Sequence, residues 1–264
     1  SLSPNIFTKD ENLGIAYGMG LTAEKVAQQW KISRESQDAF ALASHQKAAA
    51  AQKSGEFNKE ISQVSYEKRK INEVTGAVDI EVAYLSEDEG PRHDASIEGL
   101  SKLKPVFANK GSVTAGNSSQ MSDGCGALIL ASEKAIKSFG LTPLAKFVSF
   151  AVRGVPPEIM GIGPKEAIPV ALQYAGLKQD DIDWFELNEA FAAQSLAVMQ
   201  DLNLNPDKVN PLGGAIALGH PLGATGAIRS ATVIHALQRR QLKYGMVTMC
   251  VGTGMGAAGI FERV

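Results

Sequence analysis

The sequence is poor in cysteine and aromatic residues, and it has no long apolar run. Its 264 residues contain only Cys125 and Cys250, too few for a disulfide framework. Cysteine and histidine do not cluster with the spacing of a zinc site, so no metal is expected. No apolar run approaches the length of a membrane span. A net charge of −2 gives no reason to expect nucleic acid as a partner, and the sparse cysteines favour the reducing cytoplasm.

The first residues lack the features of a natural chain start. The segment from Ser1 to Asn5 has no initiator methionine, no basic stretch and no apolar stretch of a signal peptide. We therefore expect a processed, clipped or deliberately shortened chain.

The first part of the chain, through Gly111, predicts helices followed by irregular structure. Thr22 can cap a short helix, and Ser33 can cap a longer one that is rich in alanine. Short strands with charged turns are expected in residues 60–88. Residues 89–111 show little periodicity and are expected to form a long surface excursion, which is often functional.

The second part, from Ser112 on, alternates apolar strands with helical patterns, which predicts an α/β sheet with helices on its faces. The predicted strands cover residues 127–131, 144–151, 184–187, 246–251 and 259–262. The predicted helices cover residues 133–139, 164–175, 189–202 and 221–240. Glycines separate the last two strands, which are therefore expected to form a hairpin.

Three polar side chains stand where elements of the second part meet. Asn188 follows the apolar strand that ends at Leu187 and is expected to open a helix. His220 precedes Pro221, a natural first helical residue, so His220 is expected at the helix N-cap. Cys250 ends a strand and enters a glycine-rich turn. Ligands bind at the carboxyl ends of strands in α/β sheets, and all three residues are expected at such positions.

Each of these residues also has a structural interpretation. The asparagine can be a cap, the cysteine a small buried hydrophobic residue, and the histidine a structural residue. The many surrounding glycines favour a functional interpretation, because they let backbone amides approach a ligand as oxyanion donors. Together, a thiol, an imidazole and a carboxamide can supply a base, an acid and a polarising donor.

Five motifs occur in a fixed order along the chain. They read MGLTAE (19–24), TAGNSS (114–119), NEAFA (188–192), GGAIALGHP (213–221) and CVGTGMG (250–256). In order and spacing they resemble the motifs of the thiolase family, and the degradative 3-ketoacyl-CoA thiolases look closest. The resemblance covers essentially the whole chain.

The resemblance implies an α/β fold of the thiolase type, with layers in the order α/β/α/β/α. Residues 1–111 would form a coenzyme A-binding loop domain. Residues 112–142 would form the end of the N-terminal thiolase half, and residues 143–264 the C-terminal thiolase domain. The resemblance also implies a homodimer or homotetramer, and a multienzyme partner in fatty-acid β-oxidation is a further expectation.

The resemblance implies catalytic roles for four residues. His220 would be the base that activates a nucleophilic cysteine, and Asn188 would hold a water that forms one oxyanion hole with His220. Cys250 would move the proton at the α-carbon of the acetyl group, and the amide of Gly252 would donate to a second oxyanion hole. A thiolate base requires neighbours that lower its pKa, so such neighbours are expected at Cys250.

Coenzyme A and acyl-CoA would be substrates, with no covalently bound cofactor. The resemblance places the pantetheine channel at Met19, Ala115 and Ser119. It places the acyl end at Ala190 and Phe191. The nucleotide end would lie under Arg92, with His45 and Phe107 nearby.

One family motif is not found in these residues. The nucleophile of thiolases sits in a Cys-Ser-Ser-Gly motif, which does not occur here. Cys125 precedes a predicted buried strand and is expected to be a packing residue. The family activity would be thiolytic cleavage of 3-ketoacyl-CoA to acetyl-CoA and a shortened acyl-CoA, with no turnover expected from these residues alone.

Other functions remain open. An acetoacetyl-CoA-forming thiolase uses the same residues, and a non-catalytic coenzyme A-binding fragment needs only part of them. A Cys–His–Asn hydrolase is disfavoured by the glycine turn after Cys250. A decarboxylating condensing enzyme of the same fold expects histidine where Cys250 stands. The direction of reaction and the acyl chain length cannot be read from these residues.

Overall fold

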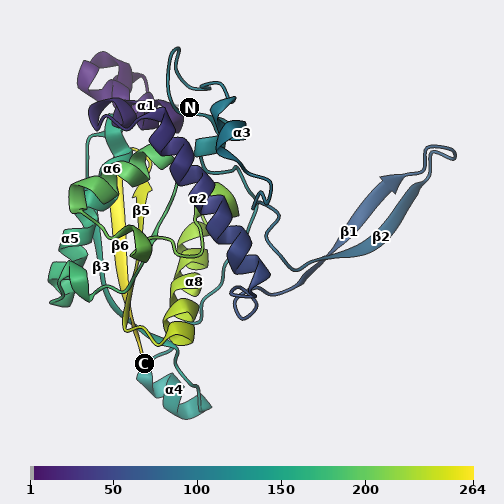
Figure 1. Ribbon diagram of the computed structural model, residues 1–264. Helices are drawn as coiled ribbons and strands as arrows, with labels where there is room; N and C mark the ends of the chain where they lie inside the picture. Colours follow the sequence, from purple (N-terminus) through teal and green to yellow (C-terminus); the bar gives the residue numbers. More distant parts are fainter. Residues whose placement is uncertain (1–2) are drawn as a thin grey trace.

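The computed structural model describes residues 3–264 and confirms a mixed α/β architecture (Figure 1). The main sheet contains four strands in the spatial order β3-β6-β5-β4. Their bounds are β3 Ala145–Gly154, β4 Trp184–Leu187, β5 Tyr244–Val251 and β6 Met255–Arg263. β4 pairs with β5 in parallel, whereas β5 with β6 and β6 with β3 are antiparallel. The predicted hairpin of the last two strands is confirmed.

Helices cover the sheet because its side chains alternate between two apolar faces. Phe185 and Leu187 of β4 belong to the core cluster that includes residues of α5 (Gly163–Ala175) and α6 (Ala192–Leu202). Trp184 points to the other face, where it packs in the cluster that includes α8 (Thr225–Arg240). Figure 1 shows α5 and α8 flanking the strands. Both faces of the sheet are therefore covered, as the alternation of strands and helices predicts.

The first part of the chain forms helices and a protruding hairpin (Figure 1). Its helices are α1 Met19–Gln29, α2 Arg34–Lys53 and α3 Ile97–Ser101. The hairpin consists of β1 Val64–Ile71 and β2 Val78–Leu85, within the region where strands were predicted. Almost all side chains of the hairpin are exposed. Ser33 caps α2 as predicted, because its hydroxyl accepts a hydrogen bond from the amide of Ser36 at 3.1 Å.

The remaining elements are short. Two are the α-helices α4 Glu133–Phe139 and α7 Ala215–Leu218. The others are 3-10 helices: η1 Pro4–Thr8, η2 Asp10–Ala16, η3 Ala115–Asn117, η4 Pro157–Ile162, η5 Gln179–Asp181 and η6 Pro206–Lys208. Within residues 3–264, no helix is both long and apolar enough to cross a membrane.

Two predicted helix starts are wrong by three to four residues. Residues 189–191 do not begin α6, because Phe191 is extended and pairs with Ser118 in a β-bridge. Pro221 does not begin α8, which starts at Thr225. Pro221 lies in the turn before the helix, and its carbonyl accepts hydrogen bonds from the amides of Ala224 and Thr225. Asn188 therefore does not open a helix. His220 is not an N-cap, nor does it follow a strand, because it lies in the loop after α7.

The predicted cap at Thr22 is also wrong. α1 begins at Met19, because Gly18 takes the extended N-cap conformation. The Thr22 hydroxyl lies inside the first turn, where it donates to the Met19 carbonyl at 2.7 Å.

The predicted buried strand at residues 127–131 is not formed. Ile129 is 93% exposed and Leu130 is 88% exposed, and no strand within the described residues pairs with this segment. Cys125 is exposed, so the packing role predicted for it is wrong. Just before this segment, the backbone of Gly126 lies against α8, because a Cβ on Gly126 would lie 2.8 Å from the amide nitrogen of Ile228.

Two glycines let the β5–β6 hairpin approach the start of α5. Gly256 is the cross-strand partner of Cys250, and a Cβ on Gly256 would overlap the backbone carbonyl of Gly163. Backbone atoms cannot rotate away from such an overlap, so position 256 requires glycine.

We predict that Gly256→Ala lowers the free energy of unfolding by at least about 2 kcal/mol. Urea denaturation followed by circular dichroism measures the change. Gly223→Ala is the matched control, because a Cβ there would meet no atom within 4 Å. Equal stability of the two variants would show that the hairpin does not depend on this close approach.

Candidate active site

Asn188 and His220 meet at the carboxyl edge of β4. Asn188 is 1% exposed, and its backbone amide donates to the carbonyl of Thr248 in β5 at 2.9 Å. Its side-chain Nδ2 lies 3.4 Å from Nε2 of His220. Its Oδ1 is buried and has no hydrogen-bond partner in the part of the chain that the structure describes. This buried oxygen is an acceptor that a donor can still satisfy.

His220 is half-buried between Asn188 and the start of α8. Its Nδ1 lies 2.7 Å from the hydroxyl of Thr225. Burial lowers the pKa of His220 below its usual value, and the positive charge of Arg229 lowers it further. The imidazole is therefore neutral at neutral pH, which is the state that a general base requires.

Arg229 belongs to a buried ion pair on the α8 side of the sheet. Its guanidinium lies 3.4 Å from the carboxylate of Glu186, and both side chains are almost fully buried. The indole of Trp184 donates to the same carboxylate at 2.7 Å. Burial raises the pKa of Glu186 to about 7, although Arg229 and the indole oppose this rise. Glu186 on β4 thus holds the guanidinium of Arg229 in place.

Cys250 is brought to the same edge by strand pairing. β4 and β5 are parallel, and Leu187 is the partner of Thr248, so Asn188 after β4 and Cys250 near the end of β5 lie at the same end of the sheet. Cys250 is buried, and this burial raises the pKa of its thiol to about 12. The expectation that neighbours lower its pKa is therefore wrong, because burial outweighs the backbone hydrogen bond that favours the thiolate. Gly252 lies half-buried in the turn that follows.

Several residues that were expected along the ligand channel lie together. The amide of Ser119 donates to the carbonyl of Ala190 at 2.9 Å. The rings of Phe107 and Phe191 make an edge-to-face contact with centroids 6.0 Å apart. The Phe107 ring lies directly against Gly20, next to Met19, in the space that a Cβ on residue 20 would occupy. These contacts join the start of α1 and the 107 loop to the motif that contains Asn188.

The other expected binding residues differ in exposure. Met19 begins α1 and is 40% exposed, and Ala115 begins η3 and is also exposed. His45 is buried in α2, where its Nδ1 accepts a hydrogen bond from the amide of Arg92 at 3.1 Å. Burial, followed by the charge of Arg92, lowers the pKa of His45. The neutral ring of His45 thus fixes the loop from which the exposed Arg92 side chain projects.

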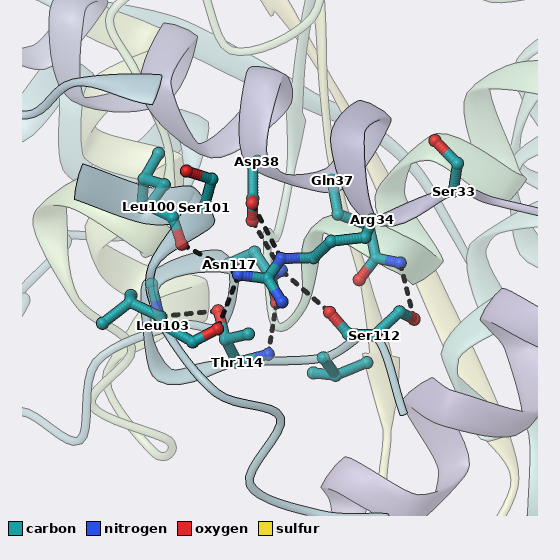
Figure 2. Close-up of polar contacts among 12 residues, drawn as sticks. Ser33, Arg34, Gln37, Asp38, Leu100, Ser101, Leu103, Ser112, Thr114 and Asn117 are labelled. Carbon is teal, nitrogen blue, oxygen red and sulfur yellow. Dashed lines mark hydrogen bonds and ion pairs between the residues drawn. The ribbon is translucent and has the colours of Figure 1, made fainter. Parts of the chain in front are cut away.

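The first turns of α2 hold the segment that leads into Ser119 (Figure 2). Asp38 is 2% exposed and pairs with Arg34 at 2.7 Å. Arg34 also donates to the carbonyls of Leu100 and Leu103, each at 2.8 Å. The Asn117 amide donates to the other oxygen of Asp38 at 3.0 Å. Figure 2 shows that Arg34 and Asp38 together tie the end of α3 and the η3 segment to α2.

Sequence reasoning missed two polar side chains that connect the motifs. Glu189 is buried and accepts hydrogen bonds from Ser44 at 2.6 Å, from Asn210 at 2.9 Å and from the amide of Ile216 at 3.2 Å. Gln120 donates to the carbonyls of Gly90, Ile216 and Ala217. Glu189 stands inside a motif, but its partners are distant in sequence and leave no local signal. Within the described residues, no three His, Cys, Asp or Glu side chains gather as a metal site.

Comparison with known proteins identifies relatives along almost the whole chain. The family model "Thiolase, N-terminal domain" matches residues 8–134, and "Thiolase, C-terminal domain" matches residues 141–263. The rat "3-ketoacyl-CoA thiolase A, peroxisomal" is 51% identical over 99% of this chain and 59% of its own length. The 3-ketoacyl-CoA thiolase of Bacillus subtilis (strain 168) is 50% identical over 98% of this chain and 66% of its own length. The chain thus spans about three fifths to two thirds of these relatives.

Solved structures show the same fold. Human mitochondrial 3-ketoacyl-CoA thiolase in complex with CoA superposes with a TM-score of 0.88 at 44% identity, covering 96% of this chain and 60% of that one. The acetyl-CoA acetyltransferase of Bacillus anthracis gives a TM-score of 0.88 at 44% identity, covering 93% of this chain and 60% of that one. The expected thiolase fold is therefore confirmed.

We predict that Asp38→Ala lowers the free energy of unfolding by at least about 2 kcal/mol, because it leaves Arg34 and Asn117 without their shared acceptor. Chemical denaturation measures the loss. Glu133→Ala is the matched control, since it removes an exposed partner of Lys137 and should leave the midpoint unchanged within error. Similar midpoints for both variants would refute the anchoring role of Asp38.

We also predict that iodoacetamide at pH 8 modifies Cys125 at least roughly a hundredfold faster than Cys250, because only the thiolate reacts. Cys125 is exposed, whereas Cys250 is a buried neutral thiol. Peptide mass spectrometry over time gives both rates, and the same reaction in denaturant should make them similar. Fast native labelling of Cys250 would contradict the raised pKa and would revive its alternative role as a nucleophile.

Proposed function

The chain belongs to the thiolase family, and on that premise we propose that it carries the proton-transfer groups of a 3-ketoacyl-CoA thiolase. The proposed reaction cleaves a 3-ketoacyl-CoA with coenzyme A to acetyl-CoA and a shortened acyl-CoA. The names of the rat and Bacillus subtilis relatives support this direction. The convergence of Asn188, His220 and Cys250 at one edge of the sheet is the observation that carries the proposal.

His220 is the proposed base toward the nucleophilic thiol. Its neutral ring can accept a proton at Nε2, the nitrogen that faces Asn188. The unpartnered Oδ1 of Asn188 supports the role of holding a water, because a buried acceptor is stabilised by a donor. That water and His220 would stabilise the thioester oxygen when it gains charge, and the amide of Gly252 would do so at a second oxygen.

Cys250 is the proposed proton donor in cleavage. Breaking the carbon–carbon bond leaves an enolate on the acetyl group, and this carbon must receive a proton to give acetyl-CoA. A neutral thiol with a pKa of about 12 holds the proton that this step consumes. Condensation would instead begin from the Cys250 thiolate, which burial disfavours. The raised pKa of Cys250 therefore supports its role as the proton donor in cleavage, while the direction of net turnover depends on the concentrations of the reactants.

Coenzyme A is the proposed ligand of the surface that α1, the 107 loop and residues 115–119 form. Met19, Ala115 and Ser119 would line the pantetheine, with Ala190 and Phe191 at the acyl end. The nucleotide end would lie at the loop that His45 fixes, under Arg92 and near Phe107. The similar human mitochondrial structure is a complex with CoA, which supports this assignment.

The acyl-accepting thiol is proposed to come from outside these 264 residues. Cys125 and Cys250 are their only cysteines, and the thiol of Cys250 is assigned to proton transfer, whereas Cys125 is exposed and lies outside the matched motifs. These residues alone are therefore expected to give no turnover. A homo-oligomer is also proposed, because the similar yeast peroxisomal thiolase is a dimer. The cytoplasmic location and the multienzyme partner stay predictions.

Calorimetry with coenzyme A, paired with a thiolysis assay, tests the proposal. We predict heat of binding and no loss of 3-ketoacyl-CoA above the buffer rate. Arg92→Ala should weaken the affinity at least about fivefold, because a charge-assisted contact is lost. Arg69→Ala, which removes an exposed arginine of the β1–β2 hairpin, is the matched control and should bind like the parent.

Each outcome bears on a separate part of the proposal. No heat with coenzyme A would count against the binding surface. Turnover above buffer would contradict the need for an outside thiol. Equal effects of Arg92→Ala and Arg69→Ala would refute the assigned nucleotide end.

A further inference from the structure

The two ring nitrogens of His220 have different partners. Nδ1 lies 2.7 Å from the Thr225 hydroxyl, and Nε2 lies 3.4 Å from Nδ2 of Asn188. A neutral imidazole carries one proton, so its partners decide which nitrogen is the donor and which is the acceptor. This choice matters, because only the nitrogen without a proton can act as a base.

The partner at Nε2 is a donor. The amide group of Asn188 presents its Nδ2 to the ring, and only a lone pair on Nε2 can accept from it. A proton on Nε2 would place two donors face to face. The contact with Asn188 therefore favours a proton on Nδ1.

The partner at Nδ1 can accept. Thr225 is 1% exposed at the start of α8, and its hydroxyl donates to the carbonyl of Pro221, four residues earlier, at 3.2 Å. Its single proton is used in that bond, so the oxygen is free to accept from Nδ1. Both ends of the imidazole thus select the same tautomer.

A competing arrangement exists, but it requires the side-chain amide of Asn188 to turn. The Pro221 carbonyl also accepts from the amides of Ala224 and Thr225, so the hydroxyl could turn toward Nδ1 without leaving that carbonyl unpaired. The proton would then sit on Nε2 and face the Asn188 amide nitrogen. That contact would be lost unless Asn188 turned its oxygen to the ring.

We propose that Thr225 is a positioning residue that holds His220 as the Nδ1–H tautomer, with the Nε2 lone pair directed at the Asn188 edge. The proposal rests on the proposed role of His220 as a base. When Nε2 takes the proton of a thiol, the sulfur keeps the electron pair as a thiolate and the ring becomes an imidazolium. Its Nδ1–H stays on Thr225, so the acceptor that orients the ring also stabilises the charged form.

Nitrogen NMR of the 264-residue chain, labelled with ¹⁵N-histidine, tests the proposal directly. The chain has four histidines, and His220→Asn identifies the His220 signals by their loss. At pH values where the ring is neutral, we expect Nδ1 to resonate as a protonated nitrogen and Nε2 as a bare one. A bare Nδ1 with a protonated Nε2 would overturn the proposal.

Substitutions at position 225 separate positioning from packing. Thr225→Val keeps the branched shape but removes the acceptor, so a mixture of tautomers is expected. Thr225→Ser keeps the hydroxyl and should restore the single tautomer. Thr232→Val, at another buried threonine of α8, is the matched control and should leave the His220 signals unchanged.

An unchanged tautomer in Thr225→Val would overturn the role of Thr225. The parent spectrum decides the tautomer even where a variant fails to fold, and Thr225→Ser decides the role of the hydroxyl. The readout needs neither coenzyme A nor turnover. A chain that binds no coenzyme A can still show the Nδ1–H tautomer, so failure of the proposed function is distinguishable from failure of this inference.

Discussion

The parallel pairing of β4 with β5 is the constraint on which the site depends. It places Asn188 and Cys250 at one end of the sheet, although 61 residues separate them along the chain. The hydrogen bond from the Asn188 amide to Thr248 extends the ladder one residue past β4. A shift of one residue would turn Trp184 and Phe185 to the wrong faces of the sheet, so the two cores also fix the catalytic register.

Buried and half-buried carboxylates fix the segments that surround this edge. A buried carboxylate is costly unless its oxygens are hydrogen-bonded, so each one binds its partners in a single arrangement. Glu24 accepts from the amides of Ser112 and Val113, and Asp38 binds Asn117 five residues later. Glu189 accepts a hydrogen bond from the amide of Ile216. Its carboxylate also lies against Gly214, because a Cβ on Gly214 would overlap it. Loops and short helices around the site thus gain a defined position.

Local signals in the sequence predicted most elements, because caps and alternation act within a few residues. Ser33 caps α2, Gly176 ends α5 in a left-handed conformation, and β4 spans residues 184–187 as predicted. Contacts between distant segments could not be predicted. Phe191 stays extended because it pairs with Ser118, and residues 127–131 stay unpaired because no described strand lies beside them. Pattern alone cannot show these partners.

The candidate site was predictable in its residue types but not in its protonation states. The order of the motifs identified Asn188, His220 and Cys250, whereas the raised pKa of Cys250 and the contact of His220 with Thr225 follow from burial and geometry.

The central claim is that this edge moves the proton at the α-carbon of a thioester. Exchange of the methyl protons of acetyl-CoA in D₂O, followed by proton NMR, measures that step without acyl transfer. We predict faster exchange with the protein than in buffer, and loss of this acceleration in Cys250→Ala. Exchange at the buffer rate, or unchanged acceleration in the variant, would contradict the claim.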